Sequence, residues 1–381
     1  MSAVGLLGIV LALLAFPFSS IERSAQRVIL FFAAFAFHIT TAVVYYYYSQ
    51  TTSSDTVLYY YDAFELRKLP VQPGTLFVIH FVQTLKQSIG GSYLDYFLLF
   101  QALGFWGIVL LMRSVEEIHL ELGAEQGWMR IVVLFLPGLY FWTSAIGKDA
   151  PLFFACSLVV WSVMHLRRRF IAFAAAVLVM VMIRPHIAFI AMVALAATAF
   201  FDPKARGHVK VGLLLIALVG AAWVASTMQA ALNVNVASAE SLGEFFSRQS
   251  GVGERVGGTT TVVTSSYPFK LFSLLCRPFF IDAQGIFGLV ASVENIFILV
   301  MIGTILRRLP ETLGLARQVF FLRFALMFGI VLTLLLALVY YNVGLGLRQK
   351  MMIMPALITF YAALTAVRST RERPASLGYA A

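Results

Sequence analysis

The stretch Tyr93–Met112, YLDYFLLFQALGFWGIVLLM, contains one charged side chain, Asp95, in 20 residues. A helix of about 20 mostly apolar residues is long enough to cross the hydrocarbon core of a bilayer. Ten further runs share this character: Ser2–Phe18, Val28–Tyr47, Ile131–Ile146, Leu152–His165, Phe170–Ile183, Ile187–Phe201, Val211–Met228, Ile286–Leu306, Val319–Tyr341 and Met351–Val367. The sequence therefore predicts an all-α, polytopic membrane bundle with about 11 transmembrane helices.

The composition excludes the main soluble classes. Charged residues make up 12% of the chain and hydrophobic residues 60%, whereas soluble domains are about 25% charged. The mean hydropathy is +0.87. A soluble enzyme, a disordered chain and a coiled coil all need more polar surface than this. Two cysteines are too few for a disulfide framework, and no Cys/His spacing indicates a zinc site. We expect residues 1–381 to form a single membrane domain.

The charge distribution predicts an orientation. A net charge of +10 is expected of a membrane protein with basic cytoplasmic loops, so it does not indicate nucleic-acid binding. Arg23 and Arg27 follow the first run and no positive residue precedes its apolar core, which argues against a signal peptide. The amino terminus is therefore predicted to lie outside. Alternation of the spans then places the basic tail 368–381 in the cytoplasm.

One region allows two topologies. Phe170–Phe201 is long enough for a single helix, which would invert everything after it. A hairpin of two short helices broken at Arg184-Pro185-His186 keeps both basic flanks on one side, and proline disfavours helix at the residue before it. We expect the hairpin. The outer side then carries residues 49–91, with a short interfacial helix at Leu76–Leu85, and the large polar loop 229–285.

Charged residues at the predicted outer ends are the candidate site. Charge at membrane depth is costly and often functional, and the positive-inside rule predicts few cations on this side. Several cations facing a few carboxylates suit a phosphate or pyrophosphate on a lipid. The candidates are Asp55, Asp62, Lys148, Asp149, Arg184, His186, Arg277, Asp282, Glu294, Arg348 and Lys350.

Many of these candidate residues also have a purely structural interpretation. Lys148 and Asp149 are adjacent and suit a local ion pair, and Asp55 suits a helix N-cap. Arg184 and His186 suit snorkelling to the interface, Arg277 suits a loop anchor, and Glu294 suits a helix–helix hydrogen bond. The tyrosines at 45–48 and 59–61 favour an aromatic belt, with a sugar-stacking platform as the alternative.

Three segments resemble a known group of proteins. Leu136–Asp149, LPGLYFWTSAIGKD, resembles the "P…FW(T/S)SG…KD" segment of polytopic proteins from bacterial exopolysaccharide and O-antigen clusters. Arg277-Pro278-Phe279 with 291–295 (ASVEN), and Asn342-Val343-Gly344 with Arg348-Gln349-Lys350 and Pro355, are similar to later segments of the same proteins. These are Wzy-like polymerases and glycosyltransferases of the GT-C superfamily.

The resemblance implies glycosyl transfer from undecaprenyl-linked saccharides outside the cytoplasm, with an acid in the first large loop at Asp55. Asp62 and Asp149 are the alternative catalytic residues. The expected substrate-binding residues are Lys148, Arg184, His186, Arg277, Glu294, Asn342, Arg348 and Lys350. No cofactor or metal site stands out, although a divalent cation bridging Asp55 or Asp62 to phosphate is compatible with the residues.

The expected partners are the lipid bilayer and, in the same pathway, a flippase and a chain-length regulator; nucleic acid is not expected. Two other classes fit the composition. A transporter or flippase of lipid-linked sugars would use the same cations for binding without breaking a bond. A structural subunit of an export complex would have scattered rather than convergent outer charges.

Overall fold

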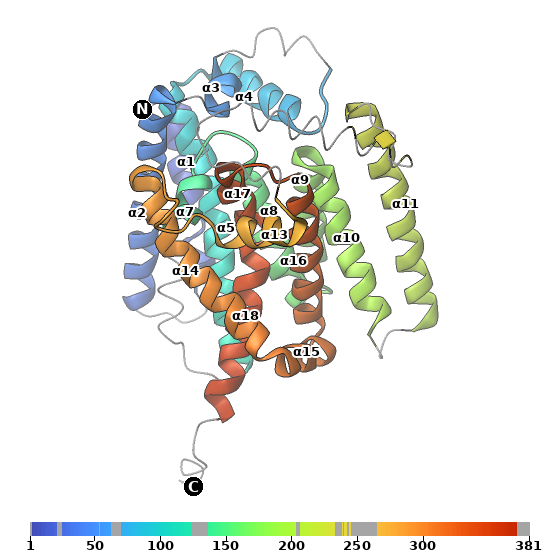
Figure 1. Cartoon of the computed structure of the whole chain (residues 1–381). Coiled ribbons are helices and arrows are strands. Elements are labelled where there is room, and N and C mark those ends of the chain that lie inside the picture. The colour runs from blue at the N-terminus through green and yellow to red at the C-terminus, as the bar shows by residue number, and fades with distance from the viewer. Residues whose placement is uncertain are drawn as a thin grey trace.

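In the computed structural model, every regular element of the described residues is a helix (Figure 1). The structure describes residues 2–20, 25–52, 54–61, 70–122, 136–202, 206–232, 238, 240–241, 244 and 265–371, and these ranges hold no β-strand. In chain order the first helices are α1 (Ala3–Leu13), η1 (Phe16–Phe18), α2 (Ala25–Thr51), α3 (Asp55–Tyr60), α4 (Thr75–Ile89), α5 (Tyr93–Glu121), α7 (Pro137–Trp142), α8 (Asp149–Met164) and α9 (Phe170–Ile183). They are followed by α10 (Pro185–Phe200), α11 (Gly207–Leu232), α13 (Tyr267–Cys276), α14 (Gly285–Arg307), α15 (Leu309–Gln318), α16 (Phe320–Leu338), α17 (Val343–Gln349), η3 (Lys350–Met352) and α18 (Met354–Arg371).

Helix α5 is the central element of the bundle. It packs against α1, α2, α8 and α18, and most of its residues are buried. The one charged residue near the start of α5, Asp95, caps the helix. Its Oδ2 accepts hydrogen bonds from the N–H (2.8 Å) and the hydroxyl (2.7 Å) of Ser92. Its Oδ1 accepts from the N–H of Ser2 (3.2 Å). The one acid in the run quoted above therefore starts the helix and ties α1 to it.

Glycines allow the backbone of α5 to approach its neighbours closely. A Cβ built on Gly8 of α1 would lie 2.3 Å from the Leu98 carbonyl oxygen, and one on Gly104 of α5 would lie 2.0 Å from the Thr143 carbonyl oxygen. Small residues at such contacts are a common packing device between membrane helices. At Gly104, α5 therefore lies in close contact with Thr143, which precedes Lys148 and Asp149 in the chain.

Gly104→Ala is expected to destabilise the protein by about 1–3 kcal/mol, the usual cost of overpacking a tight contact. Thermal unfolding of the purified protein in detergent measures the change. Gly303→Ala in α14 is the matched control, because a Cβ there meets nothing within 4 Å. A Gly104→Ala protein as stable as wild type would contradict the close contact.

Four helices in the described ranges, α2, α5, α14 and α16, are long and apolar enough to cross a membrane. The segment Val343–Val367, which bends by 59°, makes a fifth if it is one span. The chain therefore carries the helices of a membrane protein. Other apolar helices are shorter: α8 has 16 residues and α9 has 14, or about 21–24 Å at 1.5 Å per residue. Helix length does not support the predicted count of about eleven spans.

The predicted span Ile131–Ile146 is not a continuous helix in the part that the structure describes. Only α7 is helical there, six residues long and beginning at Pro137. The Thr143 and Ser144 hydroxyls donate to the carbonyls of Leu139 and Phe141, and hydroxyls that bond the backbone in this way compete with helix. The segment that follows bends instead toward the start of α8.

The predicted helix break at Arg184 is confirmed. Helix α9 ends at Ile183, Arg184 is non-helical (φ −148°, ψ 87°), and α10 begins at Pro185. The short helix expected at Leu76–Leu85 is present as the longer α4, which lies with α3 at the top of Figure 1, across one end of the bundle. Residues 233–237, 239, 242–243 and 245–264 of the loop 229–285, and all of the tail beyond Arg371, lie outside the described residues.

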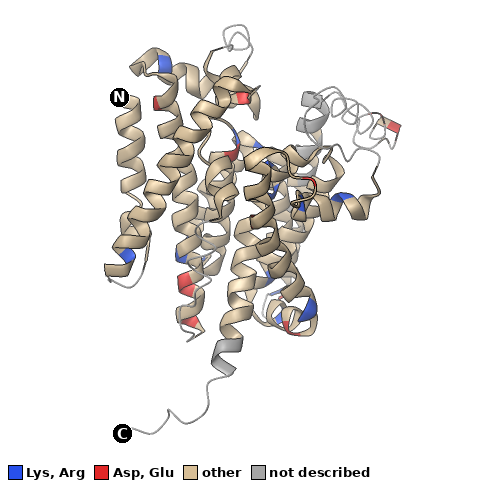
Figure 2. Cartoon of the chain, turned by 60° about the vertical axis from the view of Figure 1, so that its left-hand side comes forward, with Lys and Arg blue, Asp and Glu red and all other residues tan. Residues whose placement is uncertain are grey.

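Two groups of ion pairs lie at opposite ends of α8, and Figure 2 marks the charged residues on the ribbon. At one end Glu117 of α5 accepts from Arg113 (2.8 Å) and from both Nη atoms of Arg169 (2.9 Å each). Arg169 follows the end of α8, whereas Asp149 begins it. The second group of charges, around Asp149, is therefore at the opposite end of that helix.

Candidate functional site

Arg348 on α17 joins two carboxylates from distant parts of the sequence. Its Nε donates to Asp149 Oδ2 (2.9 Å) and its Nη1 donates to Asp55 Oδ2 (3.0 Å). Its guanidinium carbon lies 5.9 Å from the centre of the Trp142 ring. The first residues of α3 and α8 therefore meet at one arginine, which no spacing in the sequence reveals.

Two further cations lie next to this arginine. Arg184 Nη2 is 3.7 Å from Asp149 Oδ1, and its Nη1 is 4.0 Å from the Met352 sulfur. Lys148 Nζ donates to Thr75 Oγ1 (3.1 Å) at the start of α4. The local ion pair that was one alternative for Lys148 and Asp149 is not formed: Asp149 pairs with the two arginines, and the Lys148 amine donates to Thr75.

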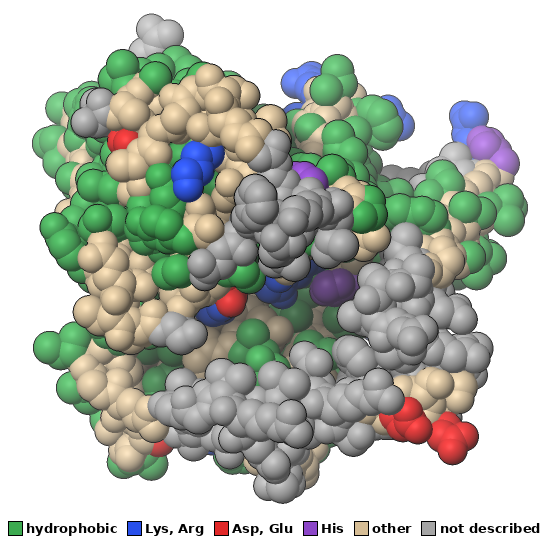
Figure 3. Space-filling model, turned by 90° about the horizontal axis from the view of Figure 1, so that it is seen from above, with side chains coloured by type: hydrophobic (Ala, Val, Ile, Leu, Met, Phe, Trp, Pro, Cys, Tyr) green, Lys and Arg blue, Asp and Glu red, His purple; other side chains and the backbone are tan. Residues whose placement is uncertain are grey.

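We refer to Asp55, Lys148, Asp149, Arg184 and Arg348 as the Arg348 cluster. Its three cations and two carboxylates leave one positive charge in excess. Figure 3 looks down on this end of the molecule and shows basic, acidic and histidine side chains in a hollow of the described surface. Such a group attracts an anion electrostatically.

The two carboxylates differ in exposure. The Asp55 side chain is 54% exposed, whereas that of Asp149 is 10% exposed. Asp149 is therefore placed to hold the two arginines as their buried counter-ion. Asp55 is placed to meet a molecule that approaches from the solvent.

Burial shapes the electrostatics around the cluster. It lowers the pKa of the Lys148 amine, and the Arg184 charge lowers it further, while Asp149 and Asp55 oppose the shift. Burial also raises the pKa of the Tyr59 hydroxyl, with Asp55 as the next cause. Tyr59 is thus a neutral hydrogen-bonding group. His186, in the first turn of α10, experiences the charges of both Arg184 and Lys148.

Local capping orients the helices that carry the cluster. Helix α3 is capped by Ser54, whose Oγ accepts from the Thr56 N–H (3.4 Å), so the N-cap role considered for Asp55 belongs to its neighbour. Helix α17 is capped by Asn342, whose Oδ1 accepts from the Leu345 N–H (2.7 Å). Asn342 was predicted to bind substrate. In the structure its side chain caps the start of α17, the helix that carries Arg348.

Asn342→Ala is expected to lower stability by about 0.5–2 kcal/mol, the cost of losing an N-cap, and to loosen α17. Asn342→Asp keeps an acceptor at the cap and should stay close to wild type. Thermal unfolding of both proteins checks this. Equal stability of Asn342→Ala and Asn342→Asp would contradict the capping role.

Arg277 lies in a separate arrangement. Its Nε and Nη2 both contact Asp282 Oδ2 (2.6 and 2.5 Å), and its guanidinium carbon lies 5.5 Å from the Phe269 ring centre. Asp282 Oδ1 accepts from the Phe279 N–H (2.5 Å). No contact in the described part of the chain joins Arg277 to the Arg348 cluster. This geometry fits the loop-anchor alternative.

Lys350 and Glu294 are buried inside the bundle. Lys350 Nζ, 1% exposed as a residue, donates to Asn295 Oδ1, and Asn295 Nδ2 donates to the Pro278 carbonyl (2.7 Å). Glu294 Oε2 accepts from the Gly138 N–H (2.5 Å). These contacts tie η3, α14 and α7 together, which fits the helix–helix alternative for Glu294.

Two neighbours of the cluster, Thr75 and Trp142, were not predicted as site residues. Trp142 lies in the segment LPGLYFWTSAIGKD, whose resemblance was the available signal, whereas no pattern in the sequence indicates Thr75. Tyr59, also a neighbour, belongs to the tyrosines considered for an aromatic belt or a sugar-stacking platform. Asp62 lies outside the described residues. Within the ranges that the structure describes, no three His, Cys, Asp or Glu side chains gather as a metal site.

Comparison of the chain with protein-family models, with curated proteins and with solved structures finds no match. The chemistry of the Arg348 cluster is therefore the basis on which a function can be argued.

Proposed function

We propose that the protein transfers a glycosyl unit from an undecaprenyl-(pyro)phosphate-linked sugar to a glycan acceptor, at the outer face of a bacterial inner membrane. Asp55 accepts the proton of the acceptor hydroxyl as its oxygen bonds to the anomeric carbon. The bond from that carbon to the phosphate oxygen breaks, and the electron pair stays on the phosphate. Arg348, Lys148 and Arg184 stabilise this leaving group.

The observation that carries the proposal is the position of Arg348 between an exposed and a buried carboxylate. Asp149 holds the arginine from within (2.9 Å), and Asp55 reaches it from the exposed side (3.0 Å). A phosphate that binds the guanidinium competes with Asp55, since both are anions that arginine binds well. Arrival of the donor would then free the Asp55 carboxylate to act as a base.

The topology belongs to the same proposal. About eleven apolar segments enter the membrane, with the amino terminus outside and the carboxyl terminus in the cytoplasm. The arginines around Glu117 then lie on the cytoplasmic side and the Arg348 cluster on the outer side. Their location at opposite ends of α8 supports this assignment.

Transport of lipid-linked sugars is the second candidate, because two helix breaks meet at the cluster. One break is at Arg184, and the other is the 59° bend after Met352. Arg184 Nη1 lies 4.0 Å from the Met352 sulfur, so the breaks are neighbours. Paired broken helices beside a binding site are typical of transporters.

Reconstituted vesicles separate the two candidates. The purified protein would receive a lipid-pyrophosphate-linked oligosaccharide with a label on the glycan. A transferase produces longer labelled glycans and releases undecaprenyl pyrophosphate in equal amount. Movement of the intact labelled lipid to the other leaflet, with no new glycosidic bond, would show that the protein is a transporter and not a transferase.

A further inference from the structure

Helix α15 connects the ends of two helices that are long and apolar enough to cross a membrane, α14 and α16. It packs against both of them, and Figure 1 shows it lying across the end of the bundle opposite to α3 and α4. A segment that joins the ends of two spans lies where the hydrocarbon meets the lipid head groups. Helix α15 is therefore located at a membrane surface.

The side chains of α15 form three different faces. Thr312 and Ala316, four residues apart, are buried and face the bundle. Leu309 and Leu313, also four apart, share a second face and are 46% and 40% exposed. Glu311 lies two positions from each leucine, and therefore on a third face, where it is exposed. Leucines on one side and a charged residue on another are typical of a helix at the boundary between lipid and water.

Hydrogen bonds hold α15 in this orientation. The Thr312 hydroxyl donates to the Ile305 carbonyl in α14 (3.1 Å). Arg323 of α16, which is buried, donates from Nε to the Ala316 carbonyl (3.0 Å) and from Nη1 to the Thr198 carbonyl in α10 (3.0 Å). A cation that bonds the last carbonyls of a helix also interacts favourably with the helix dipole. The exposed leucines cannot turn toward the bundle without breaking these bonds.

Two arginines lie where α14 ends and α15 begins. Arg307 and Arg308 stand between Leu306 and Leu309, which are both exposed. Arg307 is exposed, and among the residues that the structure describes its guanidinium has no hydrogen-bond or ion-pair partner. Arg308 Nη1 is 3.9 Å from Glu311 Oε2, which is a long ion pair. Arg307 is therefore open to an anion, and Arg308 can exchange its long contact for a shorter one.

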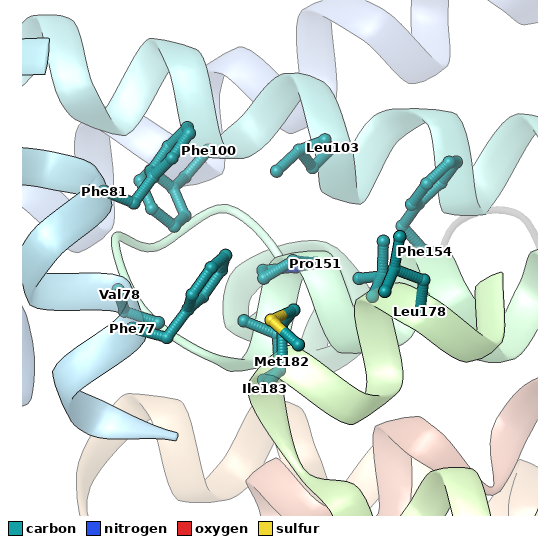
Figure 4. A pocket seen from close by; sticks show the side chains of 11 residues that line it. Phe77, Val78, Phe81, Phe100, Leu103, Pro151, Phe154, Leu178, Met182 and Ile183 are labelled. Carbon is teal, nitrogen blue, oxygen red and sulfur yellow. The ribbon is translucent and has the colours of Figure 1, made fainter. Parts of the chain in front are cut away.

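The arginines distinguish α15 from the other apolar feature of the described surface. A pocket of about 340 Å³ between α4, α5, α8 and α9 is lined by apolar side chains alone (Figure 4), so no lining group selects a charged molecule there. At residues 306–309 two leucines flank two arginines. Leucines suit acyl chains, and guanidinium groups bind phosphate. The excess positive charge favours a lipid with a net negative head group.

We propose that α15 and the end of α14 bind an anionic phospholipid, with its phosphate at Arg307 and Arg308 and its acyl chains along Leu309 and Leu313. Helix α16 runs from this site toward α17, which carries Arg348, so the lipid site and the Arg348 cluster are at opposite ends of α16. The inference therefore does not depend on the reaction at the cluster. In the proposed topology, the lipid belongs to the cytoplasmic leaflet.

Quenching by brominated lipids tests the site in the full-length protein. A fluorophore would be attached to Leu313→Cys after replacement of Cys156 and Cys276 by alanine, and measured in nanodiscs that contain brominated phosphatidylglycerol or brominated phosphatidylcholine. We expect a roughly five- to thirtyfold preference for phosphatidylglycerol, the effect of one or two arginines near an anionic lipid. The control label, at Val293→Cys, should show no preference, because this exposed residue lies about 20 Å from Arg307 along α14.

Substitution of both arginines tests their role. Arg307→Gln with Arg308→Gln should remove the preference and leave α15 in place, because Thr312 and Arg323 supply the bonds that hold it. Arg307→Lys with Arg308→Lys keeps both charges and should keep the preference. Added salt should lower the preference of the protein without these substitutions, which tests the charge even if the glutamine variant folds poorly.

Each contrary result has a defined meaning. Equal quenching of the Leu313→Cys label by the two lipids, at low and high salt, would overturn the anionic-lipid site. Absence of quenching by either lipid would overturn the interfacial position too, and would show that water or another protein covers this face of α15. Neither result bears on the Arg348 cluster, whose function is tested by turnover.

Discussion

Asp55→Asn is expected to lower the rate of glycosyl transfer by roughly 10²–10⁴-fold, the usual contribution of a general base. A sugar hydroxyl is a poor nucleophile at neutral pH, and Asp55 is the exposed carboxylate of the Arg348 cluster. Asparagine keeps the shape of the side chain but cannot accept the proton. Turnover of a lipid-linked donor by purified protein measures the effect.

Abundance and lipid binding should stay near wild type in Asp55→Asn, because the α3 cap is supplied by Ser54. Ser54→Ala is the matched control: it loses the cap, at a cost of about 1 kcal/mol, and keeps the carboxylate. Wild-type turnover in Asp55→Asn would remove Asp55 from the catalytic role. If Asp62→Asn or Asp149→Asn were then inactive although folded, the base would be that residue.

Arg348→Lys is expected to slow turnover by roughly ten- to a hundredfold, the rate equivalent of one charge-assisted hydrogen bond. Arg348 contacts Asp149 and Asp55 through two different nitrogens. A lysine has one nitrogen and acts as a point charge, so it cannot hold Asp149 and a phosphate in the same geometry. Net charge is unchanged, which isolates geometry from electrostatic attraction.

The control for Arg348→Lys is Arg317→Lys, at an exposed arginine of α15. It should leave turnover at the wild-type value. Thermal unfolding of each variant separates loss of chemistry from loss of fold. Full turnover by an Arg348→Lys protein at normal abundance would show that Arg348 does not need two nitrogens to hold Asp149 and the phosphate together.

Apolar runs located most of the helices, because burial in lipid demands continuous helical hydrogen bonding wherever the chain is apolar. They did not fix helix length. The run Ile131–Ile146 is apolar in composition, but Pro137 and the backbone-bonding hydroxyls of Thr143 and Ser144 confine the described helix to six residues. A count of apolar residues does not detect side-chain hydroxyls that compete with the helix for backbone hydrogen bonds.

The candidate site was predictable in part. Cations at the predicted outer ends indicated Lys148, Arg184 and Arg348, which the fold brings together. Lys350 could not share this site, because residues two apart on a helix point to different sides, and it is buried against Asn295. The pairing of Arg277 with Asp282 depends on the path of the loop between them, which sequence spacing alone does not define.

The affinity of purified protein for undecaprenyl phosphate tests the central claim, that the Arg348 cluster holds the lipid phosphate. Equilibrium dissociation constants would be measured for wild type, Arg348→Lys and Arg277→Lys. We predict a roughly ten- to hundredfold weaker Kd for Arg348→Lys and no change for Arg277→Lys, whose guanidinium already pairs with Asp282. Wild-type affinity in Arg348→Lys, or a larger loss in Arg277→Lys, would contradict it.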